Sequence, residues 1–209
     1  MQSPKSLFRD TQRKYIKSPI AHHLTRFVQI SKTPIKDLVI IIPDVYKDNR
    51  GFFLETYNEE RYRSMGIDAK FVQDNMSRSS FGVTRGLHFQ IPPHTQSKLV
   101  SCVVGKVWDV AVDLRQKSPT YRQWYGIELS EENHQQFFIP QGFGHGFVTL
   151  SPFAIITYKC DNLYNAHSDA GIHILDPDIN IPWPIREEEM ILSDKDRQRP
   201  LLSQICNPF

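Results

Sequence analysis

Hydrophobic residues from position 36 onward occur in short runs, separated by polar residues, Gly and Pro. The longest apolar run, residues 38–42, is followed at once by Pro43 and Asp44, which indicates a buried strand that ends in a turn. Most runs have the usual length of a β-strand, about five to seven residues. The pattern therefore predicts a mainly β protein of the sandwich or jelly-roll type. The predicted strands are residues 39–42, 51–57, 71–77, 84–89, 98–104, 106–114, 124–129, 136–139, 146–150 and 154–160.

Two acidic residues interrupt the apolar pattern of the predicted strand 106–114. Asp109 and Asp113 are four positions apart and therefore share one face of a strand. The hydrophobic residues around them favour an inward face. For Asp113 we favour a structural role, as a buried acid satisfied by backbone amides or an arginine. For Asp109 the structural and the functional role remain open alternatives.

The sequence predicts helices only in two short segments outside the predicted strands. Residues 59–65 predict a helix that Gly66 ends, and residues 186–190 predict a second, polar one. We divide the chain into an N-terminal extension outside the core (1–34), a barrel (35–185) and a charged C-terminal tail (186–209). The function of the extension is not readable from its sequence.

Composition narrows the class of protein. A chain of 209 residues with 40% hydrophobic and 23% charged residues can bury one full core. The formal charge of +2 gives no indication of nucleic-acid or membrane binding, and no segment has the length of a signal peptide core or a membrane span. Three widely spaced cysteines, Cys102, Cys160 and Cys206, suit reduced thiols and a cytoplasmic protein.

Two histidines lie in glycine-flanked, strand-like sequence, at 85–90 (RGLHFQ) and 140–147 (PQGFGHGF). The spacings Gly-x5-His88 and Pro-x-Gly-x-x-His145 are similar to those of cupins, which are double-stranded β-helix proteins. A metal-binding cupin would continue with a second histidine and a glutamate, but this chain has Gln90 and no glutamate before Lys106. A neutral amide is a poor metal ligand, so we predict a cupin-type barrel without a metal; a site at His88, His145 and His94 is the alternative.

A larger set of motifs keeps its order over residues 37–204 and resembles the dTDP-4-dehydrorhamnose 3,5-epimerase family. The motifs are 50–55 (RGFFLE), 71–75 (FVQDN), 85–90 (RGLHFQ), 98–100 (KLV), 109–115 (DVAVDLR), 118–120 (SPT), 140–147, 158–159 (YK) and 192–196 (LSDKD). The N-terminal extension is not part of the family's usual pattern.

The resemblance implies a cofactor-independent isomerase that works by acid-base chemistry. His88 is then the base that removes the proton next to a ketone, and Tyr158 is the acid that returns a proton from the opposite face. Asp196 fixes the tautomer of His88 and stabilises its imidazolium. Lys98 stabilises the enolate at the C4 oxygen. The C-terminal tail that carries Asp196 thereby belongs to the active site.

The same resemblance implies a set of substrate-binding residues. Arg50 and Arg85 suit the pyrophosphate of a nucleotide sugar, and Tyr164 matches an aromatic residue that stacks on thymine. Asp169 stands where the family often has Glu, and the shorter side chain alters that contact. Arg50 lies on an early strand that crosses into the neighbouring barrel in the family's dimers, which implies a homodimer with strand exchange. The further binding positions are Glu55, Gln73, Asn75, His145 and Lys195.

The predicted reaction is epimerisation of C3 and C5 of dTDP-4-dehydro-6-deoxy-D-glucose to dTDP-4-dehydro-L-rhamnose. A single-centre epimerase of another nucleotide-linked 4-keto sugar would carry the same His88, Tyr158 and Lys98. A metal-dependent cupin enzyme is disfavoured by Gln90. A sugar-binding cupin without catalysis would have no need for a base, an acid and a lysine together.

Overall fold

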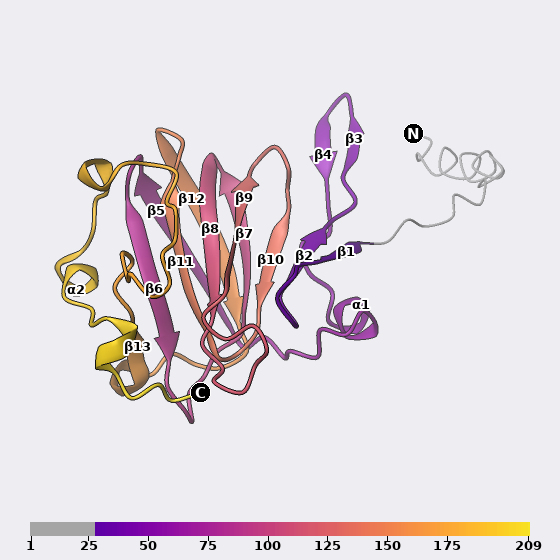
Figure 1. Cartoon of the computed structure of the whole chain (residues 1–209). Helices are drawn as coiled ribbons and strands as arrows, with labels where there is room; N and C mark the ends of the chain where they lie inside the picture. The colour runs from indigo at the N-terminus through magenta and orange to yellow at the C-terminus, as the bar shows by residue number, and fades with distance from the viewer. Residues whose placement is uncertain (1–27) are drawn as a thin grey trace, which may run out of the picture.

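The computed structural model describes residues 28–209, which fold into two facing antiparallel sheets with a small hairpin beside them (Figure 1). This arrangement confirms the predicted mainly β jelly roll. The larger sheet contains, in spatial order, β1 (Gln29–Lys32), β2 (Val39–Ile42), β10 (Gln136–Ile139), β7 (Lys98–Val104), β12 (Phe153–Cys160) and β5 (Gln73–Ser80). The smaller sheet contains β13 (Asp169–Gly171), β6 (Thr84–Gln90), β11 (Phe143–Thr149), β8 (Lys106–Asp113) and β9 (Trp124–Ser130). The hairpin is formed by β3 (Tyr46–Asp48) and β4 (Gly51–Phe53).

Some predicted strands have different ends in the structure. The predicted strand 51–57 ends at Phe53, and β11 begins at Phe143 instead of Gly146. Glycines inside β11 do not interrupt the strand here, because they allow β6 to approach closely. A Cβ at Gly146 would lie 2.8 Å from the carbonyl oxygen of Arg85. The short strands β1, β3 and β13 were missed.

Helices are short and lie at the periphery, as predicted. Helix α1 (Glu59–Ser64) begins after Asn58, whose side chain accepts a hydrogen bond from the backbone N–H of Arg61. The tail forms α2 (Asp194–Arg197) and the 3₁₀ turns η2 (Glu187–Glu189) and η3 (Leu202–Gln204), while η1 (Ala166–Ser168) precedes β13. Within residues 28–209 no helix is long and apolar enough to cross a membrane.

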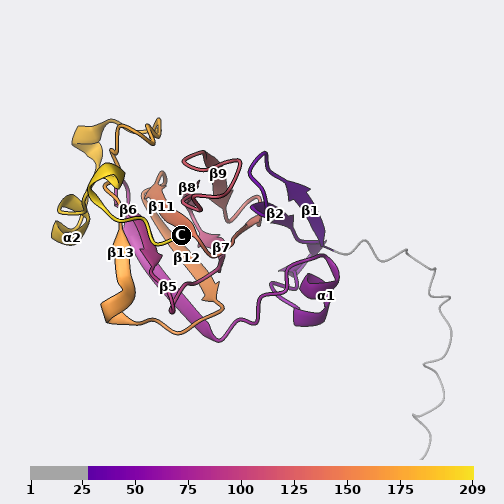
Figure 2. The same cartoon turned by 60° about the horizontal axis from the view of Figure 1, so that its bottom comes forward.

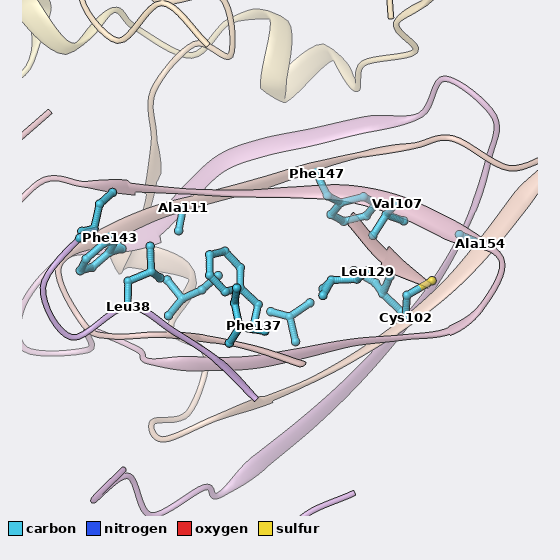
Figure 3. Close-up of a cluster of buried hydrophobic side chains, with 14 residues drawn as sticks. Leu38, Cys102, Val107, Ala111, Leu129, Phe137, Phe143, Phe147 and Ala154 are labelled. Carbon is cyan, nitrogen blue, oxygen red and sulfur yellow. The ribbon is translucent and has the colours of Figure 1, made fainter. Parts of the chain in front are cut away.

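The main hydrophobic core fills the space between the two sheets (Figure 3). Phe137 of β10 in the larger sheet is fully buried there, and Leu129 of β9 and Ala111 of β8 face it from the smaller sheet. Strand β8 shows why Asp109 and Asp113 also point inward, since they alternate with Val110 and Val112, which pack on the other side of the sheet. Both aspartates are fully buried, and Ala111 between them on the same face belongs to the core between the sheets, which confirms the inward face.

The ends of the chain lie against different parts of the barrel. The C-terminal segment covers the outer face of the smaller sheet, beside β6 and β13 (Figure 2), and Phe209 contacts Phe89 edge-on. At the other end, β1 pairs with β2 and so extends the larger sheet. Residues 29–32 of the predicted extension therefore belong to the sheet, while its first 27 residues lie outside the described part of the chain.

Candidate active site

A cavity of about 400 Å³ lies between the two sheets, where side chains of β5, β7 and β12 face those of β6 and β11. Period-two alternation explains the contribution of the larger sheet. On β5, Gln73, Asn75 and Ser77 are half-buried and the residues between them are exposed. Most of the predicted site residues line the cavity; these are Gln73, Asn75, Arg85, His88, Lys98, His145, Tyr158, Tyr164 and Asp169.

Strand β6 presents two site residues to the cavity that simple alternation would place on opposite faces. Arg85 and His88 are three positions apart, yet both line it. The pairing of β6 with β11 shifts register between these residues, so that His88 pairs with His145 and Arg85 pairs with Phe147. Gly86, in this irregularity, has φ of +129°, and a Cβ there would lie 2.6 Å from the Cα of Gly146. A glycine is therefore required where the strand bulges.

His88 makes a short hydrogen bond to a carboxylate from the C-terminal tail. Its Nε2 lies 2.5 Å from Oδ1 of Asp196, on the short helix α2. The Ser193 hydroxyl oxygen accepts from the Asp196 backbone N–H and caps this helix. Burial raises the pKa of Asp196, but the hydrogen bond and charge of His88 outweigh it, so the pKa lies below its usual value. With Asp196 ionised, Nε2 of a neutral His88 carries the proton and Nδ1 is left as the basic nitrogen.

Tyr158 and Lys98 line the cavity from the larger sheet, opposite His88. The register of β12 with β7 pairs Tyr158 with Val100 and Cys160 with Lys98, which places all these side chains on the inner face. Burial raises the pKa of Tyr158, so its phenol remains protonated near neutral pH. Burial lowers the pKa of Lys98, although nearby acidic groups oppose this effect. The cavity thus holds a neutral proton donor and a buried amine facing a histidine.

A second histidine–aspartate pair lies beside the first. Nε2 of His145 is 2.9 Å from Oδ1 and 3.0 Å from Oδ2 of Asp109. Burial raises the pKa of Asp109, which the charge and hydrogen bond of His145 oppose. This contact with a histidine that lines the cavity favours the functional alternative that the sequence left open for Asp109. Asp113 instead accepts hydrogen bonds from Arg115, Ser118 and Thr120, in agreement with its predicted structural role.

Charged side chains gather at one edge of the cavity. Asp169 of β13 binds Lys195 of α2, and its Oδ2 also accepts from Nη2 of Arg199 at 3.0 Å. These contacts tie the tail to the barrel beside His88. Lys195 lines a smaller hollow that adjoins the cavity and shares Arg85, His88 and Asp169 with it.

Two predicted binding residues lie elsewhere. Arg50, at the tip of the β3–β4 hairpin, is exposed and bonds Asp48, and Glu55 bonds Arg61 beside α1. Neither lines the cavity. In Figure 1 the hairpin projects away from both sheets. Within one chain, these residues are therefore not brought together with His88.

In the described part of the chain, no three His, Cys, Asp or Glu side chains form a group that could hold a metal ion. Gln90 and Cys160 line the cavity as well, although neither was predicted to be a site residue. Gln90 could have been identified as a lining residue because it lies two residues after His88, on the same face of the strand. Cys160 has the same relation to Tyr158.

The chain is similar to proteins of known family. A family model described as dTDP-4-dehydrorhamnose 3,5-epimerase matches residues 32–204. The dTDP-4-dehydrorhamnose 3,5-epimerase of Methanothermobacter thermautotrophicus is 50% identical over 172 residues, covering 81% of this chain and 92% of that protein. The Shigella flexneri protein of the same name is 48% identical over 170 residues, covering 81% and 93%. A crystal structure of dTDP-6-deoxy-D-glucose-3,5-epimerase from Legionella pneumophila, in complex with dTDP-4-keto-L-rhamnose, aligns with a TM-score of 0.83 at 50% identity, covering 86% and 95%.

Proposed function

The chain belongs to the dTDP-4-dehydrorhamnose 3,5-epimerase family, and we propose that it epimerises C3 and C5 of dTDP-4-dehydro-6-deoxy-D-glucose to give dTDP-4-dehydro-L-rhamnose. One observation carries the proposal. His88 and Tyr158 line one cavity from opposite sheets, and Lys98 lies on the inner face beside them. Inversion next to a ketone needs a base on one face of the sugar, an acid on the other, and a positive group at the carbonyl oxygen.

Each inversion consists of two proton transfers without net oxidation. Nδ1 of His88 takes the proton from the carbon next to the C4 ketone, and the electron pair of the broken C–H bond forms the enolate. The Lys98 ammonium stabilises the negative charge on the C4 oxygen. Tyr158 then donates its phenol proton to the same carbon from the opposite face, and the ketone re-forms. Asp196 stabilises the imidazolium that His88 becomes.

The edge of the cavity supplies the groups that a nucleotide sugar needs. Arg85 and Lys195 provide positive charge for the pyrophosphate, and the exposed ring of Tyr164 offers a face on which a pyrimidine base can stack. Asn75, Gln73 and His145 complete the polar lining. Asp169 acts here through its ion pairs with the tail, and reaches the substrate only as part of that network.

Arg50 and Glu55 enter the site in this proposal from a second copy of the chain. Phe52 and Phe53 on the projecting hairpin are 59% and 69% exposed, an apolar surface that a monomer would leave in water. A homodimer with exchanged hairpins buries these rings and brings Arg50 to the partner's cavity. A cytoplasmic location remains a prediction from the cysteine content.

The deciding experiment is incubation with dTDP-4-dehydro-6-deoxy-D-glucose in deuterated water, followed by identification of the sugar and of the exchanged positions. Deuterium at both C3 and C5 with dTDP-4-dehydro-L-rhamnose as product supports the proposal. Exchange at one carbon only would make the chain a single-centre epimerase. His88→Ala should abolish exchange at both carbons, and undiminished exchange would remove His88 from the role of base.

A further inference from the structure

Two consecutive backbone amides at the mouth of the cavity are held by glutamines from opposite sheets. The N–H of Tyr164 donates to Oε1 of Gln73 at 2.8 Å, and the N–H of Asn165 donates to Oε1 of Gln90 at 2.7 Å. Gln73 comes from β5 of the larger sheet and Gln90 from β6 of the smaller sheet. The segment that carries Tyr164 is therefore anchored to both walls of the cavity.

The side-chain amide of Gln90 bonds this segment and the nearby His94 through both its oxygen and its nitrogen. Its Nε2 donates to the carbonyl oxygen of His94 at 3.2 Å and to that of Leu163 at 3.5 Å, while Oε1 receives the N–H of Asn165. The side chain is 4% exposed, so water cannot replace these bonds when they are lost. Gln90 is the position at which a metal-binding cupin would carry a second histidine. In this chain the residue instead makes hydrogen bonds to the loop of residues 161–165.

The first half of the loop has its own anchors, since Asp161 accepts from the Ser97 N–H at 2.6 Å and the Asn162 carbonyl accepts from Gln96 at 2.7 Å. The half that carries Tyr164 depends on the two glutamine contacts and on a 3.3 Å contact between the Asn165 amide and His94. Leu163 and Tyr164 are 61% and 55% exposed, and residues 161–165 belong to none of the strands between β12 and β13. A loop with exposed side chains and no strand pairing keeps one position only through such local bonds. The Tyr164 ring can serve as a stacking surface only while its backbone is held, because a mobile ring loses conformational entropy when a ligand binds.

We propose that Gln90 is a positioning residue for the nucleotide part of the substrate: it holds the 161–165 loop so that Tyr164 is preorganised to stack on the planar base of a nucleoside diphosphate sugar. The inference rests on the proposed function, because that function supplies the nucleotide. Gln73 shares the task, but it also lines the cavity as an expected substrate contact. Gln90 therefore gives the cleaner test.

The test combines Gln90→Met with Tyr164→Ala in a double-mutant cycle, with dTDP binding measured by calorimetry and turnover measured by KM and kcat. Gln90→Met should weaken dTDP binding and raise KM about tenfold, the size expected for one lost hydrogen bond of ordinary strength, while kcat changes less than about threefold. In the Tyr164→Ala background the same substitution should change dTDP affinity less than about twofold. Equal weakening in both backgrounds, or a fall in kcat with unchanged KM, would overturn the proposal.

Two further variants complete the design. Gln90→Glu keeps the acceptor for Asn165 but places a carboxylate against two carbonyl oxygens, so its dTDP affinity should lie between wild type and Gln90→Met. If Gln90→Met does not fold, Gln90→Glu takes its place in the double-mutant cycle with Tyr164→Ala. Gln116→Met, which removes an amide that donates to the Asn207 carbonyl outside the cavity, should leave KM unchanged. Because dTDP binding needs no turnover, a wild type that binds dTDP without epimerising the sugar would refute the proposed function alone, whereas one that does not bind dTDP would refute both.

Discussion

Replacement of Asp196 by Asn tests how the tail contributes to the base. The carboxylate is 5% exposed and lies 2.5 Å from Nε2 of His88, so the substitution removes a nearly buried negative charge while it keeps the side-chain volume. The imidazolium that forms after proton removal then loses its charged partner. Asp196 lines the adjoining hollow but not the main cavity, and its nearly buried carboxylate bonds His88, so we expect the substitution to change substrate contacts little. We therefore expect a fall in kcat with little change in KM.

The size of the effect follows from the strength of the bond. A hydrogen bond between charged groups contributes about 1.5–3 kcal/mol, and each 1.36 kcal/mol of barrier is a factor of ten in rate. The Asp196→Asn enzyme should therefore lose roughly ten- to a hundredfold in kcat, and more if the amide turns its NH₂ toward His88 and enforces the wrong tautomer. KM should stay within about threefold of wild type.

Steady-state kinetics and deuterium wash-in at C3 and C5 provide the assay. Asp194→Asn is the matched control, since it makes the same chemical change on the same short helix at an exposed position, and its kcat should equal that of wild type. If Asp196→Asn raised KM and left kcat unchanged, Asp196 would be a substrate contact and the dyad would be refuted. Because the folded-state pKa of Asp196 is lowered, its ionised form stabilises the fold above the unfolded value of about 3.9. The stability difference between wild type and variant should disappear as the pH falls through the folded pKa.

Three other predictions concern the remaining parts of the site. Tyr158→Phe should retain deuterium exchange at the first carbon but slow net inversion, as measured by product chirality, and unchanged inversion would exclude the phenol as the acid. Since burial lowers the pKa of Lys98, kcat should fall on the alkaline side before the ordinary lysine value of about 10.5. Lys98→Arg, which stays charged, should move that limb to higher pH in a pH–rate profile; an unmoved limb would assign it to another group. Inactive Arg50→Glu and His88→Ala enzymes, mixed and allowed to exchange subunits, should regain up to about a quarter of wild-type activity; recovery of none would place Arg50 outside the partner's site.

The sequence was sufficient for elements whose pattern is local. Strands β7 and β10 lie where the apolar runs predicted them, because each run buries both faces or alternates with period two. It failed for β1, β3 and β13, which have three or four residues each and are mostly exposed or half-buried. Such strands are held by hydrogen bonds to the strands they pair with. The hydrophobic pattern of a short segment does not show which strand that segment will pair with.

The candidate site was found from motif resemblance, and local rules alone would have misplaced part of it. Arg85 and His88 share a cavity only because β6 slips by one residue against β11 around Gly86. Alternation along an isolated strand would have put the two side chains on opposite faces. The reason for the glycines at Gly86 and Gly146 is likewise a close approach of two backbones, visible only when the strands are paired.

The sequence by itself determined that this chain is a mainly β barrel with a histidine, a tyrosine and a lysine in family-like order. Only the tertiary structure decided that Asp109 supports His145 and that Gln90 anchors the Tyr164 loop, since it alone shows these contacts. The contact of His88 with Asp196 spans 108 positions. The physical reason is the distance along the chain over which each kind of interaction acts. Hydrophobic periodicity and turn chemistry act over a few residues, whereas the ionisation and orientation of a site's side chains depend on groups that meet only when distant strands pair and the tail docks.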